Sequence, residues 1–138
     1  MRKVEFTNLG VTIIFENNQD HIEVRKNNIP NSVDWPLHPT DPNRFRYSEY
    51  VSKFRLVDTN KGNVANTNVK VRMEVRYKKH LKGKANNNTL VLGIHNGTKW
   101  LEPTPIEKYE IDDRSNKWFG SWLIEVDLPA DPMVAWGP

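Results

Sequence analysis

The stretch at residues 69–77 constrains the fold of this chain more than any other. Its sequence, VKVRMEVRY, alternates apolar and charged residues without a break. This period of two is the pattern of a β-strand with one face buried and one face in water, because successive side chains of a strand point to opposite faces. A strand covered on one face is typical of antiparallel sheets, since parallel sheets are covered on both. The pattern therefore predicts an antiparallel β protein.

Turn signals divide the rest of the chain into short extended segments. Clusters of Asn separate these segments, and Asn favours turns because it tolerates positive φ angles. No segment has a convincing helical period. We expect about seven to nine strands, and strands at such spacing are typical of a sandwich or a small barrel. The predicted fold class is all-β, an antiparallel β-sandwich.

The chain of 138 residues has the length of one domain. We therefore expect a single β-sandwich domain over residues 1–138. Residues 27–43 hold four of the nine prolines. Proline ends helices and cannot donate to a sheet ladder, so this segment is predicted to be a long proline-rich connection.

Local patterns predict how some strands pair. Residues 11–26 read as a hairpin around a polar turn, and residues 78–88 as a loop. The apolar phase shifts near residues 49–51, which predicts a β-bulge or a break between two strands. After the strand at residues 118–127, two prolines intervene and residues 133–136 are expected to add an edge strand.

The pair Asn96-Gly97 predicts a two-residue type I′ hairpin turn, because both central residues of that turn need positive φ. In this register Gly93 faces Trp100, and the large ring covers the bare backbone of the glycine.

The C-terminal half carries a resemblance to a known group of domains. The run at residues 90–100, with the turn sequence NGTKW, is followed by extended segments at 118–127 and 132–137. This arrangement resembles the C-terminal half of immunoglobulin-like or fibronectin-III-like modules of prokaryotic surface proteins, and it covers about the last 70 residues. The Cys pair of antibody domains is absent. The resemblance implies an immunoglobulin-like sandwich that acts as a spacer, adhesion unit or ligand-binding appendage.

The sequence contains few residues or motifs that could support catalysis or bind a metal or a cofactor. Without cysteine there is neither a disulfide nor a thiolate metal site, and no nucleotide-binding or Ser-nucleophile motif is present. The histidines lack the spacing with which two imidazoles share a zinc ion: His21, His38, His80 and His95. We therefore predict no metal site and no cofactor. One catalytic option stays open, a small carboxylate-dependent enzyme that uses two of a group of acids: Glu102, Glu107, Glu110, Asp112 and Asp113.

A basic cluster follows the strand at 69–77. Its predicted patch consists of Lys78, Lys79, Lys82 and Lys84. The net charge of the chain is only +3 and this segment contains no aromatic residue, so the sequence argues against a nucleic-acid partner. No stretch is long and apolar enough to predict a membrane span.

The tryptophans carry the remaining functional predictions. Trp118 and Trp122 are expected in the core, whereas Trp35, Trp100 and Trp136 are candidate ligand-binding residues, because exposed aromatic rings stack on sugar faces or anchor partner proteins. The leading prediction is a non-catalytic structural, adhesion or interaction module of a cell-surface or secreted protein. Its partners are then other domains or proteins at the cell surface. The alternative is a carbohydrate-binding module whose partner is a polysaccharide.

Overall fold

The computed structural model describes residues 1–16, 19–27, 47, 49–61, 63–64, 69–97, 99–111 and 117–138. The chain forms two compact units. Unit 1 comprises Met1–Gln19, Lys70–Leu90 and Pro103–Asp127, and unit 2 comprises Asp20–Val69, Val91–Glu102 and Leu128–Pro138. Each unit is therefore assembled from three separate stretches of the sequence.

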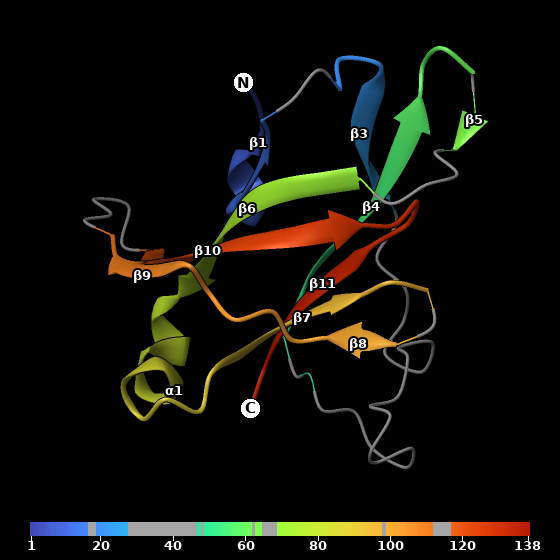
Figure 1. The fold of residues 1–138 in the computed structure, drawn as a ribbon. Helices are drawn as coiled ribbons and strands as arrows, with labels where there is room; N and C mark the ends of the chain where they lie inside the picture. Colours follow the sequence, from blue (N-terminus) through green and yellow to red (C-terminus); the bar gives the residue numbers. More distant parts are fainter. Residues whose placement is uncertain are drawn as a thin grey trace. The chain divides into compact units, whose positions relative to one another are not determined.

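The sheet of unit 1 has five strands in the order β1-β2-β6-β10-β9 (Figure 1). The bounds of these strands are β1 (Arg2–Phe6), β2 (Val11–Phe15), β6 (Val69–Lys78), β9 (Glu107–Glu110) and β10 (Trp118–Leu128). The helical segment η1 (Thr7–Leu9) lies between β1 and β2, and the segments η3 (Lys79–Leu81) and α1 (Lys82–Asn86) follow β6.

The sheet of unit 2 has six strands, in the order β3-β4-β11-β7-β8 with β5 paired to β4. Its strands are β3 (Ile22–Asn27), β4 (Glu49–Asp58), β5 (Asn63–Val64), β7 (Val91–His95), β8 (Trp100–Leu101) and β11 (Met133–Gly137). The registered pairs of both sheets are antiparallel, as in β1–β2, β2–β6, β9–β10 and β4–β11. The predicted all-β, antiparallel class is confirmed. A β-sandwich consists of two such sheets.

Strand β6 has the alternation that its sequence predicts. Its odd positions are buried throughout, and Met73 and Val75 are fully inaccessible to solvent. Its even positions are exposed or half-buried. The strand therefore presents one apolar and one polar face, as its period of two requires.

Two pairing predictions are wrong. β2 and β3 do not form a hairpin, because β2 pairs with β1 and β6 whereas β3 pairs with β4 in the other sheet. β11 is not an edge strand, because it lies between β4 and β7 and all five of its residues are buried. A short apolar strand has the same local pattern at an edge and in the middle of a sheet, so only its partners decide its position.

The predicted irregularity near residues 49–51 is confirmed as a shift within one strand. Tyr50 pairs with Ala135 and Ser52 pairs with Val134, so that Val51 is the extra residue on β4. The structure also contains more strands than the predicted seven to nine, because it resolves pairs as short as β5 and β8. Part of the predicted loop at residues 78–88 is helical, in η3 and α1.

The β7–β8 turn differs from the prediction by two residues of register. His95 pairs with Trp100, and Asn96 accepts the backbone N–H of Lys99 on its Oδ1 at 3.0 Å. Gly97 has a φ of +99°, whereas Asn96 is not in the positive region. Asn96 therefore begins the turn instead of occupying its centre, and the predicted Gly93–Trp100 pairing is wrong.

The proline-rich connection predicted at 27–43 lies outside the described residues, except for Asn27 at the end of β3. The single domain at 1–138 stays a prediction, since the two units are described separately.

Candidate functional site

A hollow of about 160 Å³ lies in unit 1 between α1 and the strands β9 and β10. Its lining includes aromatic, charged and amide residues, and the wall residues are Tyr77, Ala85, Asn86, Lys108, Tyr109, Glu110, Phe119 and Trp122. Figure 1 shows α1 beside the end of the sheet where β9 lies. The segment around α1 and the consecutive strands β9 and β10, which are distant from it in the chain, therefore meet at one place in this unit.

The floor of the hollow depends on a glycine. The ring of Tyr77 lies so close to Gly120 on β10 that a Cβ atom at this position would overlap it. Phe119, the neighbour of that glycine, has its ring centroid 6.0 Å from the ring of Tyr77, with the two planes tilted by 47°. Because Gly120 has no side chain, the rings of Tyr77 and Phe119 can lie close to each other at this end of the sheet.

Two lysines hold their charges over rings of the hollow. The Lys108 ammonium lies 4.6 Å from the centroid of Trp122, and the Lys82 ammonium lies 5.1 Å from the centroid of Phe119. Ammonium groups at these distances are attracted by the negative face of an aromatic ring. Both cations are therefore positioned before any ligand arrives.

The helical turn that carries Lys82 is fixed at both ends. Leu81 is 3% exposed and anchors the start of the segment. At the other end Asn88 takes a left-handed φ of 58°, and the carbonyl of Lys84 accepts the N–H groups of Thr89 at 2.9 Å and Leu90 at 3.1 Å. These bonds satisfy a carbonyl that a helix end otherwise leaves open.

The edge strand β9 supplies the solvent-facing side of the hollow. All four of its residues are exposed, and Tyr109 keeps 38% of its surface in water. Burial raises the pKa of the Tyr77 hydroxyl, with a further contribution from Glu110. Burial raises the pKa of Tyr109 most, a hydrogen bond with Ser121 lowers it, and Glu74 and Glu107 raise it further. Both phenols are therefore neutral hydrogen-bonding groups at neutral pH.

Of the predicted basic patch, Lys82 contacts a ring of this hollow, that of Phe119. Lys78, Lys79 and Lys82 are exposed and Lys84 is half-buried. Strand β10 and edge strand β9 bring aromatic rings beside this segment, although the segment itself contains none.

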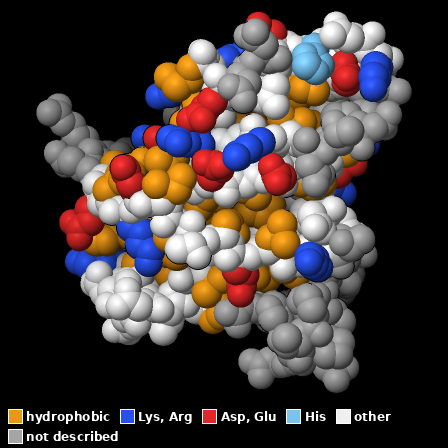
Figure 2. All heavy atoms as spheres, in the orientation of Figure 1, with side chains coloured by type: hydrophobic (Ala, Val, Ile, Leu, Met, Phe, Trp, Pro, Cys, Tyr) orange, Lys and Arg blue, Asp and Glu red, His pale blue; other side chains and the backbone are white. Residues whose placement is uncertain are grey.

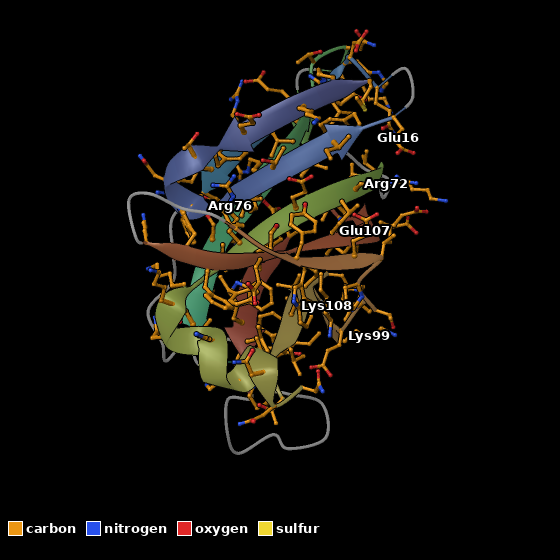
Figure 3. All side chains as sticks on the ribbon, turned by 90° about the vertical axis from the view of Figure 1, so that its left-hand side faces the viewer. Glu16, Arg72, Arg76, Lys99, Glu107 and Lys108 are labelled. Carbon is orange, nitrogen blue, oxygen red and sulfur yellow. The ribbon has the colours of Figure 1, made fainter. Side chains whose placement is uncertain are left out.

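The cations on the polar face of β6 are arranged differently. Lys70 lies 2.9 Å from Glu125, and Arg72 lies 2.9 Å from Glu16 and 3.8 Å from Glu125. Figure 3 shows Glu16 and Arg72 at the same end of the sheet. On the face in view in Figure 2, side chains of both charge signs lie among hydrophobic ones. The carboxylates on β10 and after β2 therefore offset these cations.

The candidate tryptophans are not platforms in this structure. Trp136 is 1% exposed in the central strand β11, and Trp100 is 6% exposed with its ring centroid 4.1 Å from that of Tyr47. A stacking platform needs an open ring face, so neither ring presents one. Trp35 lies outside the described residues. Trp118 and Trp122 are buried, at 8% and 5% exposure, as predicted for core residues.

The candidate acids do not gather in one unit. Glu102 belongs to unit 2, where its Oε2 accepts the Tyr47 hydroxyl at 2.7 Å. Glu107 and Glu110 belong to unit 1 and are exposed on β9, and Asp112 and Asp113 lie outside the described residues.

The buried histidine of unit 2 supports a turn. His95 accepts the backbone N–H of Gly97 on Nδ1 at 3.1 Å. Burial lowers its pKa, and the positive charge of Lys53 adds to this effect. In the described part of the chain, no three His, Asp or Glu side chains are grouped so that they could hold a metal ion.

Comparisons of the chain with protein-family models, with curated proteins and with solved structures returned no match. Within the residues that the structure describes, no helix is long and apolar enough to cross a membrane.

Sequence reasoning missed Tyr77, Tyr109 and Phe119 as members of a common site. The one local signal was Gly120, an isolated glycine inside a strand pattern, which indicates a bulge or a close approach of another group. The group that approaches it is a ring from a different stretch of the sequence.

Proposed function

We propose that this chain is a non-catalytic adhesion or interaction module of a cell-surface or secreted protein, and that the hollow of unit 1 is its ligand site. One observation carries the proposal: the ammonium groups of Lys82 and Lys108 lie over two aromatic rings of a solvent-accessible hollow. A mostly apolar hollow with a few convergent polar groups is the general form of a small-ligand site.

A saccharide is the ligand class that this site fits best. The rings of Tyr77 and Phe119 in the lining offer apolar surface, while Asn86 and Glu110 offer an amide and a carboxylate for hydroxyl groups. This moves the carbohydrate-binding alternative away from Trp100 and Trp136, whose rings are buried. The immunoglobulin-like type of the sandwich stays a prediction.

A non-catalytic role is supported by the acids of the hollow. Glycoside hydrolysis needs two carboxyl groups across the scissile bond, one of which keeps its proton in an apolar setting. Among the residues that the structure describes, the lining of the hollow contains one carboxylate, that of Glu110, which is exposed.

The test is a titration of the ¹⁵N-labelled protein with a panel of neutral and acidic oligosaccharides. We expect saturable shifts in the amide resonances of β9 and α1, and none in β1, which lies at the opposite edge of the same sheet. Mass spectrometry of the oligosaccharides after incubation should find their length unchanged. Shifts confined to unit 2, or shortened oligosaccharides, would contradict the proposal.

A further inference from the structure

We propose that the edge strand β1 is a self-association surface, and that two copies of this chain pair their β1 strands antiparallel about a two-fold axis at Val4. The two sheets then join into one. This inference is independent of the proposed ligand site, because the hollow lies at β9, at the opposite edge of the same sheet. It follows from the backbone groups, the charges and the apolar side chains of β1.

The backbone of β1 presents hydrogen-bonding groups at the border of the sheet. In the described part of the chain β1 pairs with β2 alone. The N–H of Arg76 donates to the carbonyl of Gly10 at 2.8 Å, so Gly10 and every second residue of β2 after it direct their backbone groups toward β6. The residues between them bond to the even-numbered residues of β1. The N–H and C=O groups of Lys3 and Glu5 therefore point away from the sheet.

The charges of this edge are complementary to themselves. The side chains of Lys3 and Glu5 are both exposed. In an antiparallel pair centred on Val4, Lys3 of each copy lies opposite Glu5 of the other. Each of these two pairs exchanges two N–H···O bonds, so four backbone bonds form. Opposite charges directly across two strands favour their pairing.

The same charges select this register. A pair centred on Lys3 places the two lysines opposite each other, and a pair centred on Glu5 does the same with the two glutamates. Like charges directly across a strand pair oppose pairing. The register centred on Val4 is therefore favoured over its two neighbours.

The apolar side chains of β1 lie on the other face of the strand. Val4 and Phe6 are half-buried there. At the two-fold axis Val4 meets its own copy in a non-hydrogen-bonded pair, in which the side chains of an antiparallel ladder are closest. Pairing therefore removes more of the valine from water.

The opposite edge is better protected against pairing. In β9 all four residues are exposed and three are charged. The N–H of Ile106 bonds to the carbonyl of Leu123, which is the register partner of Glu107, so two residues face one as in a β-bulge. Short, charged and bulged edges are the usual means by which proteins avoid edge-to-edge contacts. β1 has five residues in unbroken register with β2, and its charges pair across the two-fold axis.

The first measurement is the mass of the protein in solution. The contact is small, so we expect weak association with a Kd at or above about 10 μM. Sedimentation equilibrium from about 10 μM to about 1 mM should show a monomer–dimer equilibrium. Amide resonances of Lys3 and Glu5 should shift on dilution, and those of β9 should not. Affinity should fall as salt rises, because both charged pairs lie in water.

Charge reversals test the register. Lys3→Glu and Glu5→Lys each place like charges opposite one another at both ends of the pair, and each should weaken self-association roughly tenfold or more. In an equimolar mixture of the two variants, a strand with two negative charges meets a strand with two positive ones, so a mixed dimer should form. Lys108→Glu on β9 is the matched control and should leave the dimer unchanged.

A second pair of variants tests the backbone bonds. Glu5→Pro removes an N–H that points away from β2, so the sheet of the monomer should keep its fold. It should weaken the dimer more than Glu5→Gln, which keeps the N–H and removes only the charge. Circular dichroism of each variant checks the fold.

Several outcomes overturn the inference. The protein could remain monomeric up to about 1 mM, well above the expected Kd. The mixture of Lys3→Glu and Glu5→Lys could fail to associate, or Lys108→Glu could abolish the dimer, which would place the contact at β9. Each of these results rejects the pairing of β1 and leaves the proposed ligand site in the hollow untouched, since that site is tested by oligosaccharides alone.

Discussion

In each unit a tyrosine ring lies over a glycine of a strand, but one of these contacts is buried and the other borders an open hollow. In unit 2 the ring of Tyr47 lies against Gly93, and in unit 1 the ring of Tyr77 lies against Gly120. At either glycine a Cβ atom would overlap the tyrosine ring. The two sites are therefore built on the same local contact.

The difference lies in what covers the ring. Tyr47 is 2% exposed, packs against Trp100 at 4.1 Å and donates its hydroxyl to Glu102. Met133 and Ala135 complete that buried cluster. Beside Tyr77 the neighbours are instead the half-buried Phe119 and the side chains of β9 and α1, which leave the hollow open. The same contact becomes core in one unit and a candidate ligand site in the other.

The largest expected contrast is in stability. Trp100→Ala removes a buried ring and should lower the free energy of unfolding by about 3–5 kcal/mol. Tyr109→Ala removes a ring that is partly in water, so its effect should stay below about 1 kcal/mol. Urea unfolding followed by circular dichroism measures both, with Trp100→Phe as the conservative control. An equal loss of unfolding free energy in the two alanine variants would show that Tyr109 belongs to the buried core and not to an open site.

The two glycines should behave alike. Gly93→Ala and Gly120→Ala each force a methyl group against a tyrosine ring, which is expected to destabilise by about 1–3 kcal/mol. Gly83 on α1 is the control, because no atom lies within 4 Å of its added Cβ and alanine favours the helix by up to about 1 kcal/mol. If Gly93→Ala lowers the free energy of unfolding and Gly120→Ala does not, the Tyr77 ring moves readily and this part of the hollow is not rigid.

His95 gives unit 2 a stability that depends on pH. Its pKa in the folded protein lies below the usual value of 6.5, so the unfolded chain takes up the proton first as the pH falls. The stabilisation is therefore complete above about pH 6.5 and is lost toward lower pH, with a slope of at most about 1.4 kcal/mol per pH unit.

Urea unfolding of the wild type and of His95→Asn, measured between about pH 7 and pH 5, tests this sign. Asparagine keeps an acceptor near the position of Nδ1, and the variant should have a flatter pH profile. An unchanged profile in His95→Asn would assign the acid sensitivity to other groups.

The smallest effect is expected on the polar face of β6. The Lys70 side chain is 69% exposed and that of Glu125 is 38% exposed, and ion pairs in water contribute little because they are screened. Lys70→Gln should leave the urea midpoint within the error of the measurement. A clear drop in the urea midpoint would show that the face of paired charges contributes to folding.

The sequence by itself determined the type and the polarity of individual strands. The alternation at residues 69–77 is found in β6, and the phase shift near residue 50 is found in β4. These features depend only on neighbours along the chain, because side chains of a strand alternate between two faces. For the same reason the burial of Trp118 and Trp122 was predictable from their phase in β10.

Only the tertiary structure decided which strands pair and which rings are covered. The central position of β11 and the contact of Tyr47 with Gly93 both join residues far apart in sequence. The hollow has the same origin, since Tyr77, Lys108 and Phe119 come from separate stretches. Local periodicity states that a face is apolar, but its burial depends on long-range contacts, which the pattern of a single segment does not contain.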